Sequence, residues 1–441
     1  MKPQQSSNKP VRSQAIVVGL DINDPQFTGH LDEAVELVTS AGAGVAATIT
    51  GKRARPDAST FAGSGKVEEI AEAVAAHDAN LVVFNHQLSP IQIRNIEKIV
   101  NVRVIDRTDL ILDIFGQRAR SAEGKLQVEL AQMQHLMTRL VKGWTHLERQ
   151  RGGIGVRGGP GETQLEIDRR LVGERIKRLK EKLKKLGRQR NVQRASRRRA
   201  GVFNVGIVGY TNAGKSTLFN RMTRSGTYVA DKLFATLDTT TRKLYIEPGI
   251  HVTLSDTVGF IRDLPHGLVA AFRATLIEAM EADLLLHVVD AASDAHQQHI
   301  VDVNLVLTEI GANDIPQVLV FNKIDRLGGI PFATVLRNED DKIVELRVSA
   351  LSGLGVDLVR ETIKQHATAS GLSADANNYG EAEINANANA SAGANANAHQ
   401  GEPQQSSSFL RAGLRCESEN LIETSQPPIA DTIRSELNAV I

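Results

Sequence analysis

The stretch FNVGIVGYTNAGKST at residues 203–217 constrains the fold more than any other part of the chain. Its apolar, β-branched first half predicts a strand, and the pattern Gly209-x-x-x-x-Gly214-Lys215-Ser216 leads from that strand into a helix. Glycines let backbone N–H groups close around phosphates, and the positive end of the helix dipole points at the same place. We expect Lys215 to reach the β- and γ-phosphates of a nucleotide and Ser216 to bind Mg²⁺. Such a strand–loop–helix unit belongs to a parallel sheet with helices on both faces.

Three further motifs follow in order, each at the end of a predicted strand. The strand IHVTLSD leads into residues 256–259, where Asp256 would hold Mg²⁺ through water and the Gly259 amide would touch the γ-phosphate. The strand VLVFNKID ends on a carboxylate, Asp325, that we expect to be buried and to accept two N–H groups of guanine, a donor pair that adenine lacks. The segment ELRVSAL supplies the backbone of residues 349–351 for the guanine O6. Together these motifs predict a guanine-nucleotide domain.

Two features near the γ-phosphate are less clear. The segment DKLFATLDTTTRKL should supply a mobile threonine that senses Mg²⁺, but the pattern does not choose among Thr236, Thr239, Thr240 and Thr241. Phe260 follows the DTVG turn, where many related enzymes have a glutamine that orients the attacking water. A phenyl ring cannot hydrogen-bond water, so the sequence predicts slow hydrolysis unless another molecule supplies that function.

Residues 14–115 alternate strand-like runs (AIVVGL, VAATIT, LVVFN and VRVID) with segments of helical periodicity, which predicts a small parallel α/β sheet. Within this region, Gly63-Ser64-Gly65-Lys66 resembles a phosphate loop by letter only. It lacks the preceding glycine and the magnesium-binding hydroxyl, so we interpret it as a turn that opens a helix.

The next part of the chain has heptad spacing, which predicts two helices packed as an antiparallel coiled coil. The first seam comprises Leu126, Leu130, Met133, Met137, Leu140, Trp144 and Leu147, and the second comprises Val172, Ile176, Leu179, Leu183 and Leu186. The glycine-rich connection at residues 151–161 also carries arginines, with Arg149 just before it. It fits either a flexible linker or a finger that orders against nucleic acid, and we favour the finger because a linker needs no arginines.

Charge supports a polyanion partner for this hairpin. Residues 141–200 contain 19 Lys and Arg against 6 Asp and Glu, so 19 − 6 = +13, although the whole chain carries only +1.

Other features of the sequence exclude or disfavour further kinds of site. The absence of a long apolar run excludes membrane insertion, and a single cysteine, Cys416, excludes an intramolecular disulfide. His296 and His299 are expected on a solvated helix face rather than at a metal. The stretch after Thr368 has low complexity and is expected to be disordered.

The hairpin segment ELAQMQHLMTRLVKGWTHLERQRGGIGVRGGPGETQLEIDRR, with FATLD, DTVGF and NKID, resembles the HflX family of ribosome-associated GTPases over residues 14–368. In that family the N-terminal domain and the hairpin bind the large ribosomal subunit near its peptidyl-transferase centre. The ribosome activates the GTPase, and the protein can split or rescue stalled ribosomes under stress. The resemblance implies that Thr236 is the Mg²⁺ threonine and that a hydrophobic residue replaces the catalytic glutamine. The family often has a proline after FATLD, where this chain has Thr239, which implies a different loop stiffness.

With this resemblance, the candidate catalytic residues are Lys215, Thr236 and Gly259, and the candidate Mg²⁺ ligands are Ser216 and Thr236. The candidate nucleotide-binding residues are Gly209, Tyr210, Thr211, Asn212, Ala213, Gly214, Lys215, Ser216, Phe234, Ala235, Thr236, Leu237, Asp238, Asp256, Thr257, Val258, Gly259, Asn322, Lys323, Ile324, Asp325, Ser349, Ala350 and Leu351.

The leading hypothesis is a monomeric, cytoplasmic GTPase, with peripheral membrane association as a further expectation. It would bind GTP or GDP with Mg²⁺ and contact ribosomal RNA of the large subunit through residues 141–200. The alternatives are an RNA scaffold that only holds GTP and a regulatory switch acting on another protein. The expected division is a loose tail at 1–13, an α/β domain at 14–116, a basic helical hairpin at 117–200, a GTPase domain at 201–368 and a disordered tail at 369–441.

Overall fold

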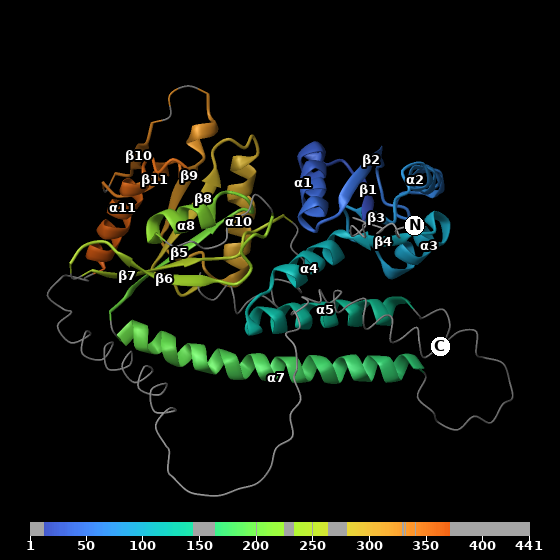
Figure 1. Cartoon of the computed structure of the whole chain (residues 1–441), viewed down its shortest axis with the longest axis horizontal. Helices are drawn as coiled ribbons and strands as arrows, with labels where there is room; N and C mark the ends of the chain where they lie inside the picture. Colours follow the sequence, from blue (N-terminus) through green and yellow to red (C-terminus); the bar gives the residue numbers. More distant parts are fainter. Residues whose placement is uncertain are drawn as a thin grey trace, which may run out of the picture.

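The computed structural model describes residues 13–143, 164–199, 201–224, 233–248, 250–262, 280–328, 330, 332–339 and 341–370. Two α/β domains lie side by side, and a long helical hairpin runs beneath both of them (Figure 1). The expected disordered tail lies outside the described residues except for its first two, of which Ala369 is helical, and the arginine-bearing glycine-rich connection lies outside them entirely.

The N-terminal α/β domain contains four parallel strands in the order β2-β1-β3-β4. The strands are β1 (Gln14–Asp21), β2 (Gly44–Lys52), β3 (Leu81–Phe84) and β4 (Arg103–Asp106). The helices are α1 (Phe27–Ser40), α2 (Ser64–Ala76), α3 (Pro90–Val100) and α4 (Arg107–Arg118). The segment that resembles a phosphate loop opens α2, which begins directly after Gly63 with its φ of 85°. The predicted parallel α/β sheet is confirmed.

The C-terminal α/β domain contains a seven-stranded sheet in the order β10-β11-β9-β8-β5-β7-β6. The strands are β5 (Phe203–Gly209), β6 (Thr240–Tyr245), β7 (His251–Asp256), β8 (Leu284–Asp290), β9 (Gln317–Asn322), β10 (Thr334–Arg337) and β11 (Ile343–Arg347). The helices are α8 (Lys215–Thr223), α10 (His296–Ile310) and α11 (Val356–Ala369), with a 3₁₀ turn η2 (Ile324–Arg326). Only the edge strands β6 and β10 pair antiparallel, so the motifs at the ends of β5, β7 and β9 meet at one edge of the sheet.

The hairpin consists of α5 (Ala122–Gly143) and α7 (Gln164–Arg199). Ion pairs show that the helices are antiparallel, because Glu129 pairs with Arg175 whereas the earlier Glu123 pairs with Arg190. The buried seam contains Leu130, Met133, Ile176 and Leu179, all of which belong to the predicted heptads. Trp144 and Leu147 lie outside the described residues.

One apolar core joins the two α/β domains. It includes Phe115 of α4 and Phe234, Tyr210 and Phe260 of the C-terminal domain. The rings of Phe115 and Phe234 meet edge to face with their centroids 4.6 Å apart, a geometry that aromatic pairs favour. The loops that follow β5 and β7 are therefore packed against the N-terminal domain. No helix within the described part of the chain has the length and hydropathy needed to cross a membrane.

Candidate functional site

The loop between β5 and α8 has the backbone that its glycines predict. Gly209 has a φ of 146°, and a Cβ there would lie 2.2 Å from the carbonyl oxygen of Val288. Gly214 has a φ of 92°, so both positions require glycine. Lys215 is buried, and its Nζ donates to the carbonyl oxygen of Tyr210 at 2.6 Å. Burial lowers the pKa of Lys215 to about 8, although the nearby Asp256 acts in the opposite direction.

Three oxygen-bearing side chains meet beside this lysine, and we call them the hydroxyl–carboxylate cluster. The Ser216 Oγ lies 2.7 Å from the Thr236 Oγ1 and donates to the Asp256 Oδ2 at 2.6 Å. Thr236 also donates to that oxygen at 3.2 Å. Burial raises the pKa of Asp256, and its Oδ1 is buried with no hydrogen-bond partner among the described residues. Hard oxygen ligands of this kind suit Mg²⁺, so the cluster fits that ion.

The structure places Thr236, rather than the other three threonines, in this cluster. Thr240 and Thr241 belong to β6, where the Thr241 hydroxyl bonds to that of Ser255 at 2.8 Å. The pattern alone left all four threonines open, because the position depends on how the loop packs.

The opposite side of the pocket is built from the ends of β9 and β11. The Asn322 side chain donates to the Ala213 carbonyl at 3.0 Å and accepts from the Ala350 amide at 2.9 Å, so it ties the phosphate loop to this side. Asp325 lies on the rim, where one of its oxygens accepts from the Ser349 hydroxyl. The prediction of a buried Asp325 was wrong, because the side chain is exposed to the pocket opening.

A pocket of about 260 Å³ lies between these two sides. The predicted residues that line it are Thr211, Asn212, Gly214, Lys215, Ser216, Phe234, Ala235, Thr236, Gly259, Asn322, Lys323, Asp325 and Leu351. Thr217 and Arg326 line it as well and were missed, although each directly follows a motif residue. The predicted residues outside the lining are Gly209, Tyr210, Ala213, Leu237, Asp238, Asp256, Thr257, Val258, Ile324, Ser349 and Ala350. Several of these residues lie behind the lining residues and contact them.

Leu237 and Asp238 do not face the pocket, because both side chains are used in contacts between domains. Leu237 is 2% exposed in the shared apolar core. The Asp238 carboxylate accepts from the backbone N–H groups of Arg120 and Ser121, each at 2.8 Å. The sequence motif FATLD therefore contains a threonine directed to the pocket and two neighbours directed away from it.

Phe260 is directed away from the pocket by the backbone that carries it. Its amide donates to the Gly209 carbonyl at 3.1 Å, and its carbonyl accepts from the Thr211 amide at 2.7 Å. This bridge sets Gly259 against Lys215, where a Cβ would lie 2.9 Å from the lysine Nζ. The Phe260 ring is 2% exposed in the shared core.

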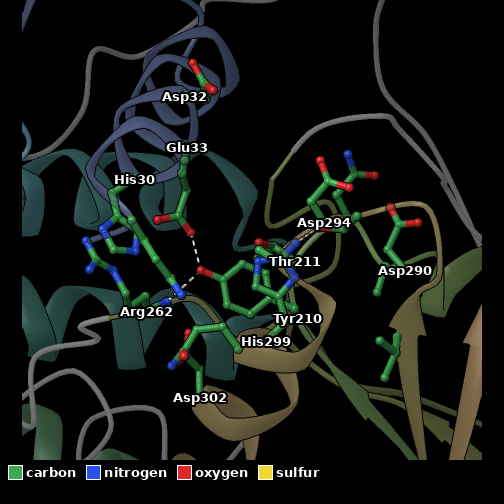
Figure 2. Close-up of a pocket in the computed structure, with 18 of the residues that line it drawn as sticks. His30, Asp32, Glu33, Tyr210, Thr211, Arg262, Asp290, Asp294, His299 and Asp302 are labelled. Atoms are coloured by element: carbon green, nitrogen blue, oxygen red, sulfur yellow. Dashed lines mark hydrogen bonds between the residues drawn. The ribbon is translucent and has the colours of Figure 1, made fainter. Parts of the chain in front are cut away.

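A polar network connects the phosphate loop to the N-terminal domain (Figure 2). The Tyr210 hydroxyl donates to Glu33 of α1 and accepts from the backbone amide of Arg262 at 3.1 Å. Arg107 is buried and donates to Glu33 at 2.8 Å, to the Arg262 carbonyl at 3.1 Å and to Asn85 at 2.8 Å. Burial raises the pKa of Tyr210, so the hydroxyl stays a donor at all ordinary pH values.

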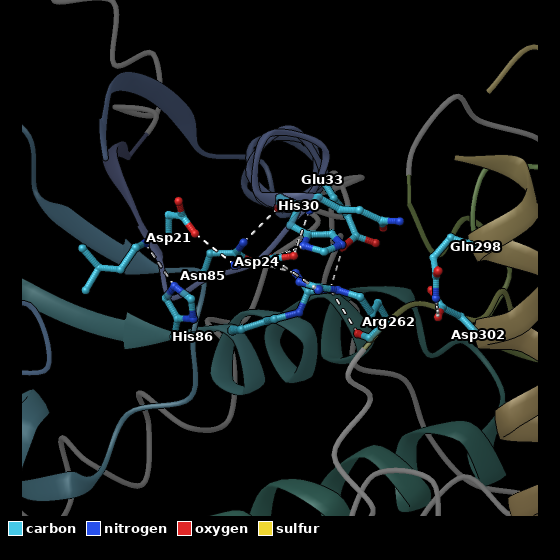
Figure 3. Close-up of polar contacts among 12 residues, drawn as sticks. Asp21, Asp24, His30, Glu33, Asn85, His86, Arg262, Gln298 and Asp302 are labelled. Carbon is cyan, nitrogen blue, oxygen red and sulfur yellow. Dashed lines mark hydrogen bonds and ion pairs between the residues drawn. The ribbon is translucent and has the colours of Figure 1, made fainter. Parts of the chain in front are cut away.

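Arg262 continues this network on the side of the N-terminal domain (Figure 3). Its guanidinium lies 3.7 Å from the Asp24 carboxylate, which also bonds to the His30 ring. Arg262 therefore has direct polar contact with the loop before α1, through Asp24, and with α4, through Arg107.

A cleft of about 530 Å³ lies next to this network, between α1 and α10. It shares Thr211 and Asn212 with the nucleotide pocket, so the two cavities adjoin at the phosphate loop. The expectation of a solvated His299 was wrong, because its ring stacks on Tyr210 at 3.9 Å between centroids. Burial lowers the pKa of His299, which leaves the stacked ring neutral.

The fold and the pocket together define the class of protein to which this chain belongs. A phosphate loop with a buried lysine meets a strand-end aspartate on one side and an Asn-Lys-x-Asp turn on the other, which is the arrangement of P-loop guanine-nucleotide-binding proteins. Consistent with this, the chain matches the family profiles described as GTP-binding GTPase N-terminal over residues 28–116, GTP-binding GTPase Middle Region over 118–197 and 50S ribosome-binding GTPase over 204–323.

Similarity to individual proteins identifies the family to which the chain belongs. The chain is 54% identical to GTPase HflX of Escherichia coli K12 over 343 residues, which are 78% of this chain and 80% of that protein. It is 51% identical to GTPase HflX of Magnetococcus marinus, over 74% of this chain and 75% of that protein. The chain belongs to the HflX family of GTPases.

Among solved structures, the chain is similar to a GTP-binding protein from the archaeon Sulfolobus solfataricus in complex with GDP. The likeness covers 81% of this chain and 99% of that chain, with 24% identity and a TM-score of 0.42.

Proposed function

We propose that this GTPase binds the large ribosomal subunit, that the subunit stimulates its hydrolysis of GTP, and that it serves to split or rescue stalled ribosomes under stress. The exposed basic face of α7 carries this proposal. Between Gln164 and Arg199 the helix contains 15 Lys and Arg against 4 Asp and Glu, so 15 − 4 = +11. The exposed basic side chains include Lys177, Lys180, Lys184 and Lys185. A surface of this charge suits the phosphates of ribosomal RNA.

The proposed division of labour in the nucleotide pocket follows its geometry. Lys215 neutralises the β- and γ-phosphates, the Gly259 amide contacts the γ-phosphate, and Ser216 and Thr236 hold Mg²⁺ with Asp256 behind them. The bound ion would supply positive charge to the phosphate oxygens. Asp325 selects guanine through its two N–H groups.

Residues 14–116, 117–200 and 201–368 are proposed to act as three units. The hairpin would bind RNA, the C-terminal unit would hydrolyse GTP, and the N-terminal unit would bind the subunit together with the hairpin. We propose further that the protein acts as a monomer in the cytoplasm, where its ribosomal partner is found.

Stimulation by the subunit follows from the position of Phe260. Phosphoryl transfer depends on positioning and on charge stabilisation, and groups supplied by a partner raise the rate of other GTPases by about 10³–10⁵. The Phe260 ring is buried in the shared core, so the water must be oriented by backbone groups or by RNA. We therefore expect low basal turnover and strong stimulation.

The test is GTP turnover by the whole protein with and without purified large subunits. Stimulation of a hundredfold or more supports the proposal, whereas turnover that subunits do not change would favour the GTP-holding scaffold. Binding to subunits should also weaken as salt rises, since phosphate contacts release counterions.

A charge variant connects the binding to α7. Lys184→Gln with Lys185→Gln should reduce the slope of log affinity against log salt by roughly one for each phosphate that the helix no longer neutralises. The matched control replaces Lys243 and Lys342, two exposed lysines of the C-terminal domain, with glutamine. Equal effects of the two pairs would show that net charge, rather than α7, governs the binding.

A further inference from the structure

The segment that carries Thr236 is held on both sides by helices outside its own domain. On the N-terminal side, Phe234 is 2% exposed and packs edge to face on Phe115 of α4. Its φ of 55° is a left-handed conformation that a phenylalanine adopts only when surrounding contacts impose it. The packing against α4 therefore determines the backbone two residues before the threonine.

On the C-terminal side, Asp238 is bound to the start of α5. Its carboxylate accepts from the backbone N–H groups of Arg120 and Ser121 and from the Ser121 hydroxyl. The same hydroxyl accepts from the Gly124 amide at 2.8 Å, so Ser121 caps α5 while Asp238 binds the cap. A carboxylate at a helix N-terminus is also favoured by the helix dipole.

Gly124 makes room for this contact. It lies in the first turn of α5, and a Cβ there would be 2.2 Å from the Asp238 Oδ1. Its φ is not in the left-handed region, so the backbone alone does not require glycine at this position. A Cβ at this position would instead displace the Asp238 carboxylate from the place in which it binds α5.

We infer that Asp238 is a positioning residue for hydrolysis: by binding the first turn of α5, it fixes the Mg²⁺ threonine Thr236 two residues away. This inference rests on the proposed role of Thr236 in the hydroxyl–carboxylate cluster. Because α5 is also the first helix of the basic hairpin, a displacement of the hairpin changes the position of Thr236. An RNA partner on the hairpin and the γ-phosphate in the pocket therefore act on the same short segment.

Two substitutions test the contact from opposite sides in the full-length protein. Asp238→Ala removes the carboxylate, and Gly124→Ala displaces it while favouring helix, since alanine is the better helix former. Both should slow single-turnover hydrolysis by about tenfold or more, because misplacement of a reacting group by about 1 Å costs up to a hundredfold. Both should raise the Mg²⁺ concentration that gives half the maximal rate. The affinity for GDP, which lacks the γ-phosphate, should stay the same.

Matched controls separate positioning from general stability. Ser89→Ala removes the cap of α3, and Gly65→Ala adds a methyl group in the first turn of α2, where nothing lies within 4 Å. Neither should change the rate or the Mg²⁺ dependence. If the Gly124→Ala variant hydrolyses GTP at the normal rate, or if the controls slow hydrolysis equally, the inference is overturned.

A double-mutant cycle with Thr236→Ala shows whether Asp238 acts through that threonine. If it does, adding Asp238→Ala to the Thr236→Ala variant should slow hydrolysis no further. Effects that multiply would overturn the positioning role while leaving the role of Thr236 intact. Normal hydrolysis by Thr236→Ala alone would instead overturn the proposed Mg²⁺ role, and the inference with it.

Discussion

The Tyr210→Phe substitution removes one oxygen atom from the contact between the phosphate loop and the N-terminal domain. The hydroxyl donates to Glu33 and accepts from the Arg262 amide, and the residue is 8% exposed. The phenyl ring of the variant keeps the stacking on His299 and the apolar contacts of the shared core. The change therefore isolates the polar part of the interface.

The magnitude follows from these two hydrogen bonds. A bond to a charged group contributes about 1.5–3 kcal/mol, and an amide left without a partner costs about 1–3 kcal/mol. Glu33 keeps its bond to Arg107, and water can reach it from the adjoining cleft, so the loss should fall slightly below the sum of the two lower limits, about 2.5 kcal/mol. We expect the docked state to lose about 2 kcal/mol, which is roughly 30-fold in the docking equilibrium at about 1.4 kcal/mol per factor of ten.

The amide of Leu233 reports docking directly. It donates to the Ser40 Oγ of α1 at 3.0 Å, across the domain boundary, and Leu233 is buried. Hydrogen exchange followed by mass spectrometry on a fragment containing Leu233 should therefore become about 30-fold faster in the variant. Tyr245→Phe removes the same atom from a side chain that is 71% exposed, and it should change this exchange by less than twofold.

Unchanged exchange at Leu233 in Tyr210→Phe would refute the reasoning, because the hydroxyl would then contribute nothing to docking. Equal acceleration in both tyrosine variants would also refute it.

Four other predictions concern the nucleotide pocket and the neighbouring Phe260. Asp325→Asn should weaken GTP binding and improve binding of xanthosine triphosphate, whose C2 oxygen replaces the guanine amino group; competition binding measures both. Because Lys215 has a pKa of about 8, GTP binding should take up about half a proton at pH 8 and almost none at pH 6.5, as calorimetry in buffers of different ionisation enthalpy would show. The unfolded chain, with a lysine pKa near 10.5, binds more protons between pH 8 and 10.5, so this group makes the free energy of unfolding rise with pH in that window. Phe260→Ala should destabilise the protein by about 3–5 kcal/mol in thermal or denaturant unfolding, yet subunits should still stimulate its turnover measurably.

The phosphate loop and the sheets could be predicted because their signals are local. Gly209 and Gly214 report backbone angles that only glycine adopts easily, and the apolar runs around them report buried parallel strands. The hairpin seam could be predicted as well, because Leu130 and Met133 of α5 and Ile176 and Leu179 of α7 follow the heptad spacing of two helices that pack on each other.

The contacts between domains could not be predicted in the same way. Tyr210 and Glu33 are 177 residues apart in the chain, and Asp238 and Ser121 are 117 apart. A tyrosine in a phosphate loop or an aspartate after a threonine has no local pattern that names a distant partner. The choice of Thr236 among four threonines depended on the same packing, which is why the residues alone left it open.

The position of Phe260 is decided by backbone geometry rather than by its ring. In an extended segment, successive side chains point to opposite sides. Gly259 must face the phosphate loop, because a Cβ there would lie 2.9 Å from the Lys215 Nζ, so the next residue must face the shared core. The hydrogen bonds from Phe260 to Gly209 and from Thr211 to Phe260 fix this register. A glutamine at position 260 in the same register would enter the apolar core, where its amide would lack partners, instead of reaching the attacking water. We therefore expect Phe260→Gln to lower stability without raising basal turnover. A Phe260→Gln variant that hydrolyses GTP faster than the parent protein, in the absence of subunits, would show that the segment can turn and that the ring itself limits the reaction.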